Sequence, residues 1–164
     1  MAASKVIIRK DNSILFTKEP KENEWMPGRW GLPGGKYYLH ESISEGTQRK
    51  IREEAGVACE IKGLFKIVQI LMPEKTVYHF VFIADYVSGE IGKDQVFSSE
   101  LKWLDKDEIL AMAKDDLTEY YSDEILKEYF AHPERLIRLE VIKELYSFKD
   151  MKIQEWMQKG RKEN

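Results

Sequence analysis

The first half of the chain contains two kinds of hydrophobic pattern. Runs rich in β-branched and aromatic residues at 6–10 and 14–17, separated by three polar residues, predict a short β-hairpin. Longer runs of the same kind at 60–71 and 76–87 surround a turn and predict a second pair of antiparallel strands. These four segments together predict a β-sheet.

A helical pattern lies between the two predicted hairpins. The side chains that recur every four residues, and so give a helix one narrow buried face, are Ile43, Thr47, Ile51 and Ala55. Ser42 can cap the first free amides, and Glu45 can return the bond as a capping box. Gly56 can adopt the left-handed conformation that ends a helix. The sequence therefore predicts one helix between Ser42 and Gly56.

The adjoining side of this helix carries a charged stripe of Gly46, Lys50, Glu53 and Glu54. The two adjacent carboxylates lie at the negative end of the helix dipole, which costs about 0.3–1 kcal/mol each. Ion pairs of Arg49 with Glu53 and of Lys50 with Glu54 offset this by only about 0.2–0.5 kcal/mol each. A hard divalent cation would offset it better, and the alternative is a solvated face of ion pairs.

The residues around the helix resemble the signature motif of the Nudix (MutT-like) hydrolases. The matching positions are Gly35, Glu41, Arg49, Ile51, Glu53, Glu54, Gly56 and Val57. The preceding segment 30–35 is also similar to the family, whereas Lys50 stands where the family has a glutamate. The resemblance implies an α/β fold, the Nudix-type α/β/α sandwich, in which a mixed β-sheet has the motif helix on one face and later helices on the other.

The resemblance also implies a metal-dependent site. In the family, acidic residues of the motif hold a divalent ion, Mg²⁺ or Mn²⁺, against a pyrophosphate that water then cleaves. This role falls here on Glu53 and Glu54, with the carbonyl of Gly35 near the metal, Gly34 beside the substrate and Arg49 orienting the carboxylates. The implied substrate is a nucleoside diphosphate derivative: a nucleotide sugar such as ADP-ribose, a dinucleotide or a (d)NTP.

Lys50 leaves three outcomes open. An ammonium with an ordinary pKa near about 10.4 is cationic and cannot coordinate a metal. It can take the place of one metal ion and contact the substrate phosphates, or pair with Glu53 or Glu54 and close the site, or be compensated by a ligand from elsewhere. We expect a hydrolase with weakened activity; the alternative is a catalytically impaired nucleotide- or partner-binding protein.

Residues outside the motif add further candidates. Trp25, in the polar loop 19–29, either stacks on a nucleobase or packs down on its own loop. The resemblance implies that an extra catalytic or metal-binding carboxylate can come from the loop near the end of the core, as in some relatives. Glu100 is then the first candidate, before Asp94 and Glu90, and otherwise it is an ordinary strand residue. Pro73, sixteen residues after Val57, is a weak hint of ADP-ribose-cleaving relatives.

The chain after about residue 113 is predicted to be helical. One helix is expected at 123–130, and Pro133 is expected to open another whose apolar rhythm continues to Trp156. We expect one Nudix domain over 1–164, with a core of about 1–113 and a helical extension of about 114–164. The extension can cover its own core, shape the substrate pocket or form a homodimer contact.

Composition narrows the class of protein. A chain of 164 residues with 43% hydrophobic content suits one globular domain, and a net charge of −3 gives no basic field for duplex nucleic acid. Its one cysteine, Cys59, excludes a disulfide framework and is expected to pack as a small apolar residue. His40 is expected on the surface and His79 in a packed strand. The sequence shows no signal-peptide core and no membrane span, so we expect a cytoplasmic protein with no membrane partner.

Overall fold

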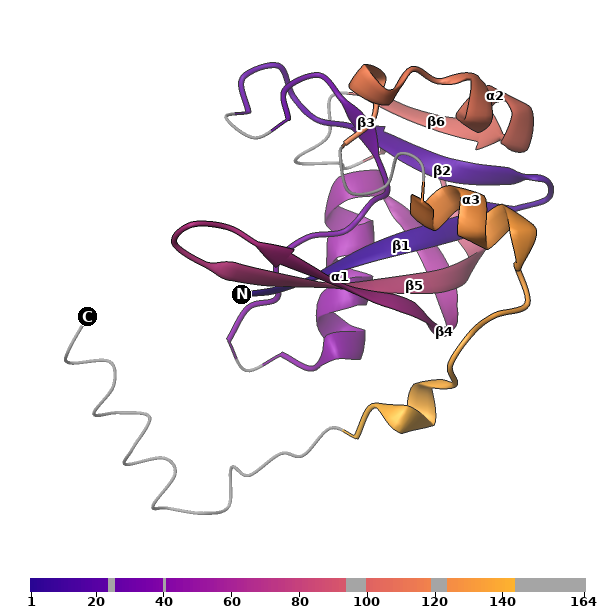
Figure 1. The fold of residues 1–164 in the computed structure, drawn as a ribbon. Helices are drawn as coiled ribbons and strands as arrows, with labels where there is room; N and C mark the ends of the chain where they lie inside the picture. The colour runs from indigo at the N-terminus through magenta and orange to yellow at the C-terminus, as the bar shows by residue number, and fades with distance from the viewer. Residues whose placement is uncertain (24–25, 40, 94–99, 119–123, 144–164) are drawn as a thin grey trace, which may run out of the picture.

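The computed structural model describes residues 1–164 except 24–25, 40, 94–99, 119–123 and 144–164. Its elements are β1 (Ala2–Lys10), β2 (Ser13–Lys18), β3 (Trp30–Gly31), α1 (Ile43–Ala55), β4 (Val57–Leu71), β5 (Thr76–Gly89), β6 (Glu100–Asp105), α2 (Lys106–Ala111) and α3 (Glu124–Ala131), with 3₁₀ turns η1 (Lys114–Asp116) and η2 (Leu139–Val141) (Figure 1). Both predicted strand pairs and the motif helix are present.

The strands form one mixed sheet in the order β3-β2-β1-β5-β4, and β6 pairs with β2. β1 runs antiparallel to β2 and parallel to β5, while β4 and β5 form a long antiparallel pair. The two-residue strand β3 was not predicted, because so short a segment has no periodicity. It places the loop that follows it beside the start of β1.

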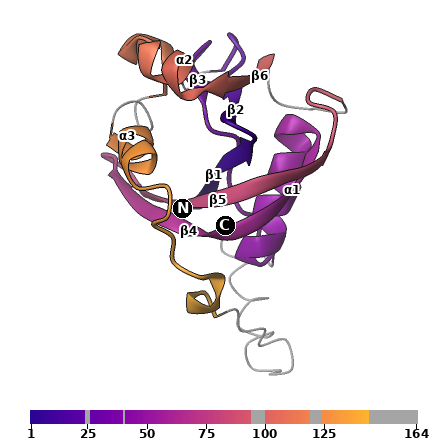
Figure 2. The same cartoon turned by 90° about the vertical axis from the view of Figure 1, so that its right-hand side faces the viewer.

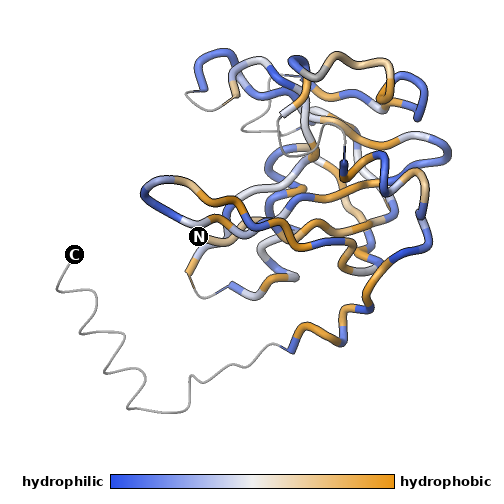
Figure 3. Tube along the Cα trace, viewed as in Figure 1, coloured by the Kyte–Doolittle hydropathy of each residue, from blue (hydrophilic) through white to orange (hydrophobic). Residues whose placement is uncertain are grey.

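Helices cover both faces of the sheet, with α1 on one side and α2 and α3 on the other (Figures 1 and 2). Alternation along β1 divides the core accordingly, because Val6 and Ile8 pack with α1 whereas Ile7 packs with α3. The hydrophobic stretches gather in the central strands, and the outer turns are hydrophilic (Figure 3). This arrangement confirms the predicted α/β/α sandwich.

Both predicted ends of α1 are confirmed. Ser42 and Glu45 form the capping box, and Gly56 ends the helix with a φ of 71° and an N–H bond to the carbonyl of Arg52. Gly46, which belongs to the predicted stripe, is buried. A Cβ at Gly46 would lie 2.7 Å from Glu41 Oε1, so this position packs against the loop before the helix.

The segment after α3 departs from the prediction. α3 confirms the helix expected at 123–130, but no helix begins at Pro133 within residues 133–143. Instead, Ile137 donates its N–H to the carbonyl of Leu64 and accepts the N–H of Leu64, at 2.7 and 2.9 Å. The outer edge of β4 offers unpaired backbone groups, and the hydrogen bonds between Ile137 and Leu64 form in place of the bonds within a helix. The rest of the predicted helical stripe, 144–164, lies outside the described residues.

Among the described helices, none has both the length and the apolar character needed to cross a bilayer. Cys59 is buried within β4, as expected for a small packing residue.

Candidate active site around the glycine loop

The site is built on Pro33, Gly34 and Gly35, which run beside the start of β1. Ser4 donates its N–H to the carbonyl of Gly35, and Val6 donates to Pro33, each at 2.9 Å. Gly34 has a φ of 145°, and a Cβ there would lie 2.9 Å from the Cα of Lys5 and closer still to the carbonyl oxygen of Ser4. Only glycine fits this approach of two backbones.

Glu54 is held by this loop, because the N–H of Gly34 donates to Glu54 Oε2 at 2.8 Å. Burial raises the pKa of the Glu54 carboxyl, and the neighbouring Lys5, the N–H of Gly34 and Lys50 act in the opposite direction. The structure therefore ties the last turn of α1 to the glycine loop and places two ammonium groups near one carboxylate.

Arg49 binds two carboxylates at once. Its Nε and Nη2 donate to the two oxygens of Glu41 at 2.8 and 2.5 Å, and its Nη1 donates to Glu53 at 3.0 Å. The guanidinium also lies 3.7 Å from the centre of the Tyr38 ring. The hydrogen bond to Arg49 is the main cause that lowers the pKa of Glu41. Arg49 thus orients the Glu53 carboxylate by a direct hydrogen bond.

Lys50 also binds Glu53. Its Nζ lies 3.1 Å from Glu53 Oε2, so the observed ion pair is with the residue three positions on rather than with Glu54, four positions on, as the spacing predicted. Burial acts to raise the pKa of Glu53, but its bonds to Lys50 and Arg49 outweigh this, and the pKa is lowered. A Cβ on Gly35 would lie 3.0 Å from the Lys50 side chain and 3.4 Å from Glu54 Oε1. Lys50, both carboxylates and Gly35 therefore form one cluster.

The cluster can be tested for its fit to a metal ion. Carboxylate and carbonyl oxygens, as in Glu53, Glu54 and Gly35, are the ligands that Mg²⁺ prefers. Within the described residues, however, no group of three or more acidic, His or Cys side chains is placed to hold a metal. The oxygen donors of Glu53, Glu54 and Gly35 have the chemistry that suits a divalent ion, and such an ion would compete with Lys50 for Glu53.

Among the described residues, no hydrogen bond or ion pair joins Glu100 or Glu90 to this cluster, and the other predicted site residues fall outside the described chain. Glu100, on β6, pairs with Lys102 at 2.9 Å and with Lys18 at 3.4 Å, and these bonds lower its pKa. Glu90 is exposed. The residues that fall outside the description are Trp25, His40 and Asp94.

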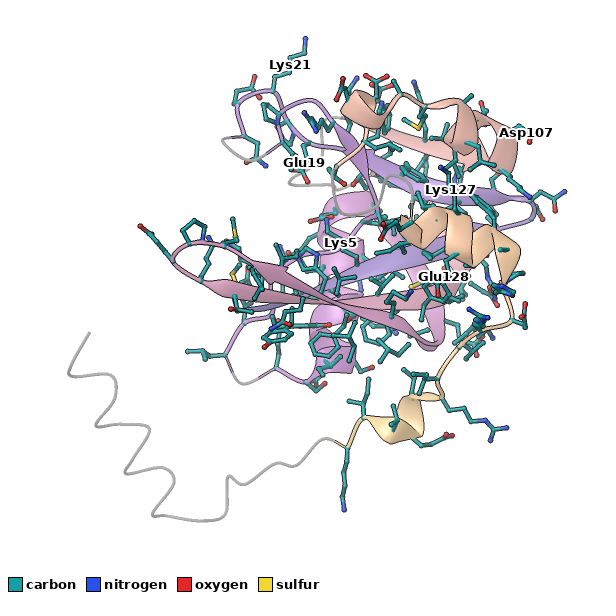
Figure 4. The ribbon with its side chains drawn as sticks, viewed as in Figure 1. Lys5, Glu19, Lys21, Asp107, Lys127 and Glu128 are labelled. Atoms are coloured by element: carbon teal, nitrogen blue, oxygen red, sulfur yellow. The ribbon has the colours of Figure 1, made fainter. Side chains whose placement is uncertain are left out.

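Sequence reasoning did not select Lys5. Its Nζ donates to the carbonyl of Leu32 at 3.2 Å, and in Figure 4 it lies near the centre of the view, below the loop that carries Glu19. Burial and the charge of Lys5 lower the pKa of His79 to about 4, so this half-buried strand histidine is neutral at pH 7. The sequence does contain a signal that could have selected Lys5. Side chains two apart on a strand share a face, so Lys5 lies on the same face of β1 as the core residue Ile7.

Comparison with known proteins identifies the family. Over 127 residues the chain is 32% identical to an ADP-ribose pyrophosphatase of Methanocaldococcus jannaschii, covering 75% of this chain and 69% of the relative. Over 86 residues it is 36% identical to the 8-oxo-dGDP phosphatase NUDT18 of Danio rerio, covering 52% of this chain but only 25% of that relative.

A similar solved structure is the MutT protein of Methanosarcina mazei Go1, with a TM-score of 0.70 and 25% identity, covering 82% of this chain and 95% of that one. The model of the NUDIX domain matches residues 1–125, which is most of the chain. The chain therefore belongs to the Nudix hydrolase family, whose members are generally pyrophosphohydrolases.

Proposed function

We propose that this protein hydrolyses the pyrophosphate linkage of a nucleoside diphosphate derivative, with one Mg²⁺ or Mn²⁺ ion held by Glu53 and Glu54. The observation that carries the proposal is the fixed orientation of these two carboxylates at the glycine loop, one by Gly34 and the other by Arg49. A relative named as an ADP-ribose pyrophosphatase supports ADP-ribose as the first substrate to test, before dinucleotides and (d)NTPs.

Each residue of the cluster has a defined task in this proposal. When bound, the metal ion would neutralise charge that develops on the phosphate oxygens. Arg49 keeps the Glu53 carboxylate directed at the ion, and the N–H of Gly34 does the same for Glu54. Gly35 lets the backbone approach the diphosphate, and Lys50 contacts a phosphate oxygen as a point charge.

Two further residues complete the proposed site. Glu100 would contribute an additional carboxylate after leaving Lys102 and Lys18, and Trp25 would stack on the base. Stacking of this kind is worth about 1–3 kcal/mol in proteins that bind single strands.

A second candidate function is nucleotide or partner binding without turnover. The observation that favours it is the 3.1 Å ion pair between Lys50 and Glu53, which occupies a carboxylate that the metal needs. A buried or partly buried pair of this kind holds the carboxylate in one position at the expense of metal affinity.

The two functions are separated by an activity panel. ADP-ribose, other nucleotide sugars, dinucleotides and nucleoside triphosphates would be incubated with Mg²⁺ or Mn²⁺, and phosphate-containing products would be measured. Wild type is compared with Lys50→Glu, and Arg52→Glu, exposed on the same helix, is the matched control for the charge change. We expect wild-type turnover and faster turnover in Lys50→Glu only.

Two results decide against the proposal. A silent wild type together with an active Lys50→Glu variant would favour the binding function. Wild-type turnover that survives the double change Glu53→Gln and Glu54→Gln would remove these two residues as metal ligands.

A further inference from the structure

Two lysines from different elements lie close to the glycine pair. Lys50, on α1, passes Gly35 so closely that an added Cβ would be 3.0 Å from its Cδ and Cε atoms. Lys5, on β1, has its Cα 2.9 Å from the Cβ position of Gly34, and its Nζ donates to Leu32 in the segment that leads into the loop. The loop therefore brings together two lysines that are 45 positions apart in the sequence.

The charges of the site differ from those of a purely acidic metal site. Arg49 binds both oxygens of Glu41, so these two groups largely neutralise each other. Lys50 pairs with Glu53, and Lys5 acts on Glu54, which the loop holds. Glu19 adds a negative charge whose effect on Glu54 is weaker than that of either lysine. An anionic ligand can therefore approach without a metal ion first neutralising the carboxylates.

We propose that Lys5 and Lys50 together bind the two phosphates of a nucleoside diphosphate beside the glycine loop, and that they do so without a divalent ion. The ligand class rests on the proposed function; the residues and the metal-free mode are additional to it. An ammonium carries three donors, so Lys50 can contact a phosphate oxygen while it remains paired with Glu53. Gly34 and Gly35 have no side chain that would hold the diphosphate away from the two lysines.

The test is the affinity for α,β-methylene-ADP, a diphosphate that cannot be cleaved between its phosphates, measured by calorimetry in the presence of EDTA. We expect wild type to bind, and high salt to weaken binding because the attraction is between charges. Lys5→Met and Lys50→Met should each weaken binding by about tenfold, the size of one lost hydrogen bond to a charged group. AMP should bind more weakly than the diphosphate.

Matched variants separate a binding role from a structural one. Lys62→Met removes the same charge from β4, two strands away from β1, where the lysine pairs with Glu60, and it should leave the affinity unchanged. Lys5→Arg and Lys50→Arg keep a cation and should retain metal-free binding. Thermal unfolding of every variant shows whether a loss of affinity follows from a loss of the fold.

The inference is overturned if α,β-methylene-ADP binds only when Mg²⁺ is added, or if Lys5→Met binds as well as wild type in EDTA. The measurements also distinguish a failure of the lysine pair from a failure of the proposed hydrolase function. Turnover with Mg²⁺ but no binding in EDTA would leave the hydrolase standing and remove the lysine pair. Lysine-dependent binding in EDTA with no turnover on any substrate would support the lysine pair and count against the hydrolase.

Discussion

Replacing Gly34 by alanine tests the central contact of the site. Gly34 has a φ of 145°, a backbone region that L side chains rarely adopt, and its Cβ would collide with the backbone of Ser4 and Lys5. Backbone atoms of a central strand cannot move aside as a flexible side chain can. The loop must therefore shift away from β1, and its bonds to Glu54 and to β1 must lengthen.

The loss of stability is the sum of the backbone strain and the weakened hydrogen bonds. A residue held in an unfavourable backbone region costs about 1–3 kcal/mol. Losing the hydrogen bonds from Gly34 to Glu54 and from Ser4 to Gly35 adds about 0.5–1.5 kcal/mol each. We expect Gly34→Ala to lower the free energy of unfolding by about 2–6 kcal/mol, a large part of the total for a domain of this size.

Gly28→Ala is the matched control, because Gly28 also has a positive φ, 72°, but among the described residues no atom beyond its chain neighbours lies within 4 Å of its Cβ position. This variant should lose only about 1–2 kcal/mol. Both values come from urea unfolding followed by far-ultraviolet circular dichroism, with the slope of each transition compared to wild type. Equal destabilisation of the two variants would refute the close approach of the loop to β1.

Two further predictions concern single ionisable groups. In Glu41→Gln, Arg49 loses one of its two carboxylate partners and keeps Glu53, and we expect about 1–3 kcal/mol less stability at neutral pH. Because the pKa of Glu41 is lowered in the folded state, its contribution is present above the unfolded value of about 4.3 and disappears as the pH falls through the folded value. Urea unfolding at several pH values should show wild type and variant converging in acid, and a difference that stays constant would contradict this. Burial raises the pKa of the Cys59 thiol to about 11, so the folded protein should react slowly with a disulfide reagent at mildly alkaline pH and rapidly in urea. Fast reaction of the folded protein would show that this part of β4 is open.

The sequence by itself determined the elements whose signals are local. The boundaries of α1 follow from a capping serine, an apolar period of about four and a terminal glycine, all within one segment, so the prediction from 42 to 56 agrees with the structure. The two strand pairs were equally accessible, because alternation and turn residues are also local. The resemblance of the motif then supplied the layered fold and the family.

Tertiary structure decided which partner each polar group has. Glu53 and Glu54 are both within reach of Lys50 on one helix face, and the surrounding packing places its Nζ at Glu53. The segment after Pro133 has a helical pattern, yet Ile137 pairs with the edge of β4, because an exposed strand competes for the same backbone groups. Lys5 comes to lie beside the glycine loop only when β3 places that loop along β1. Such contacts join residues far apart in the chain, and no local pattern encodes them.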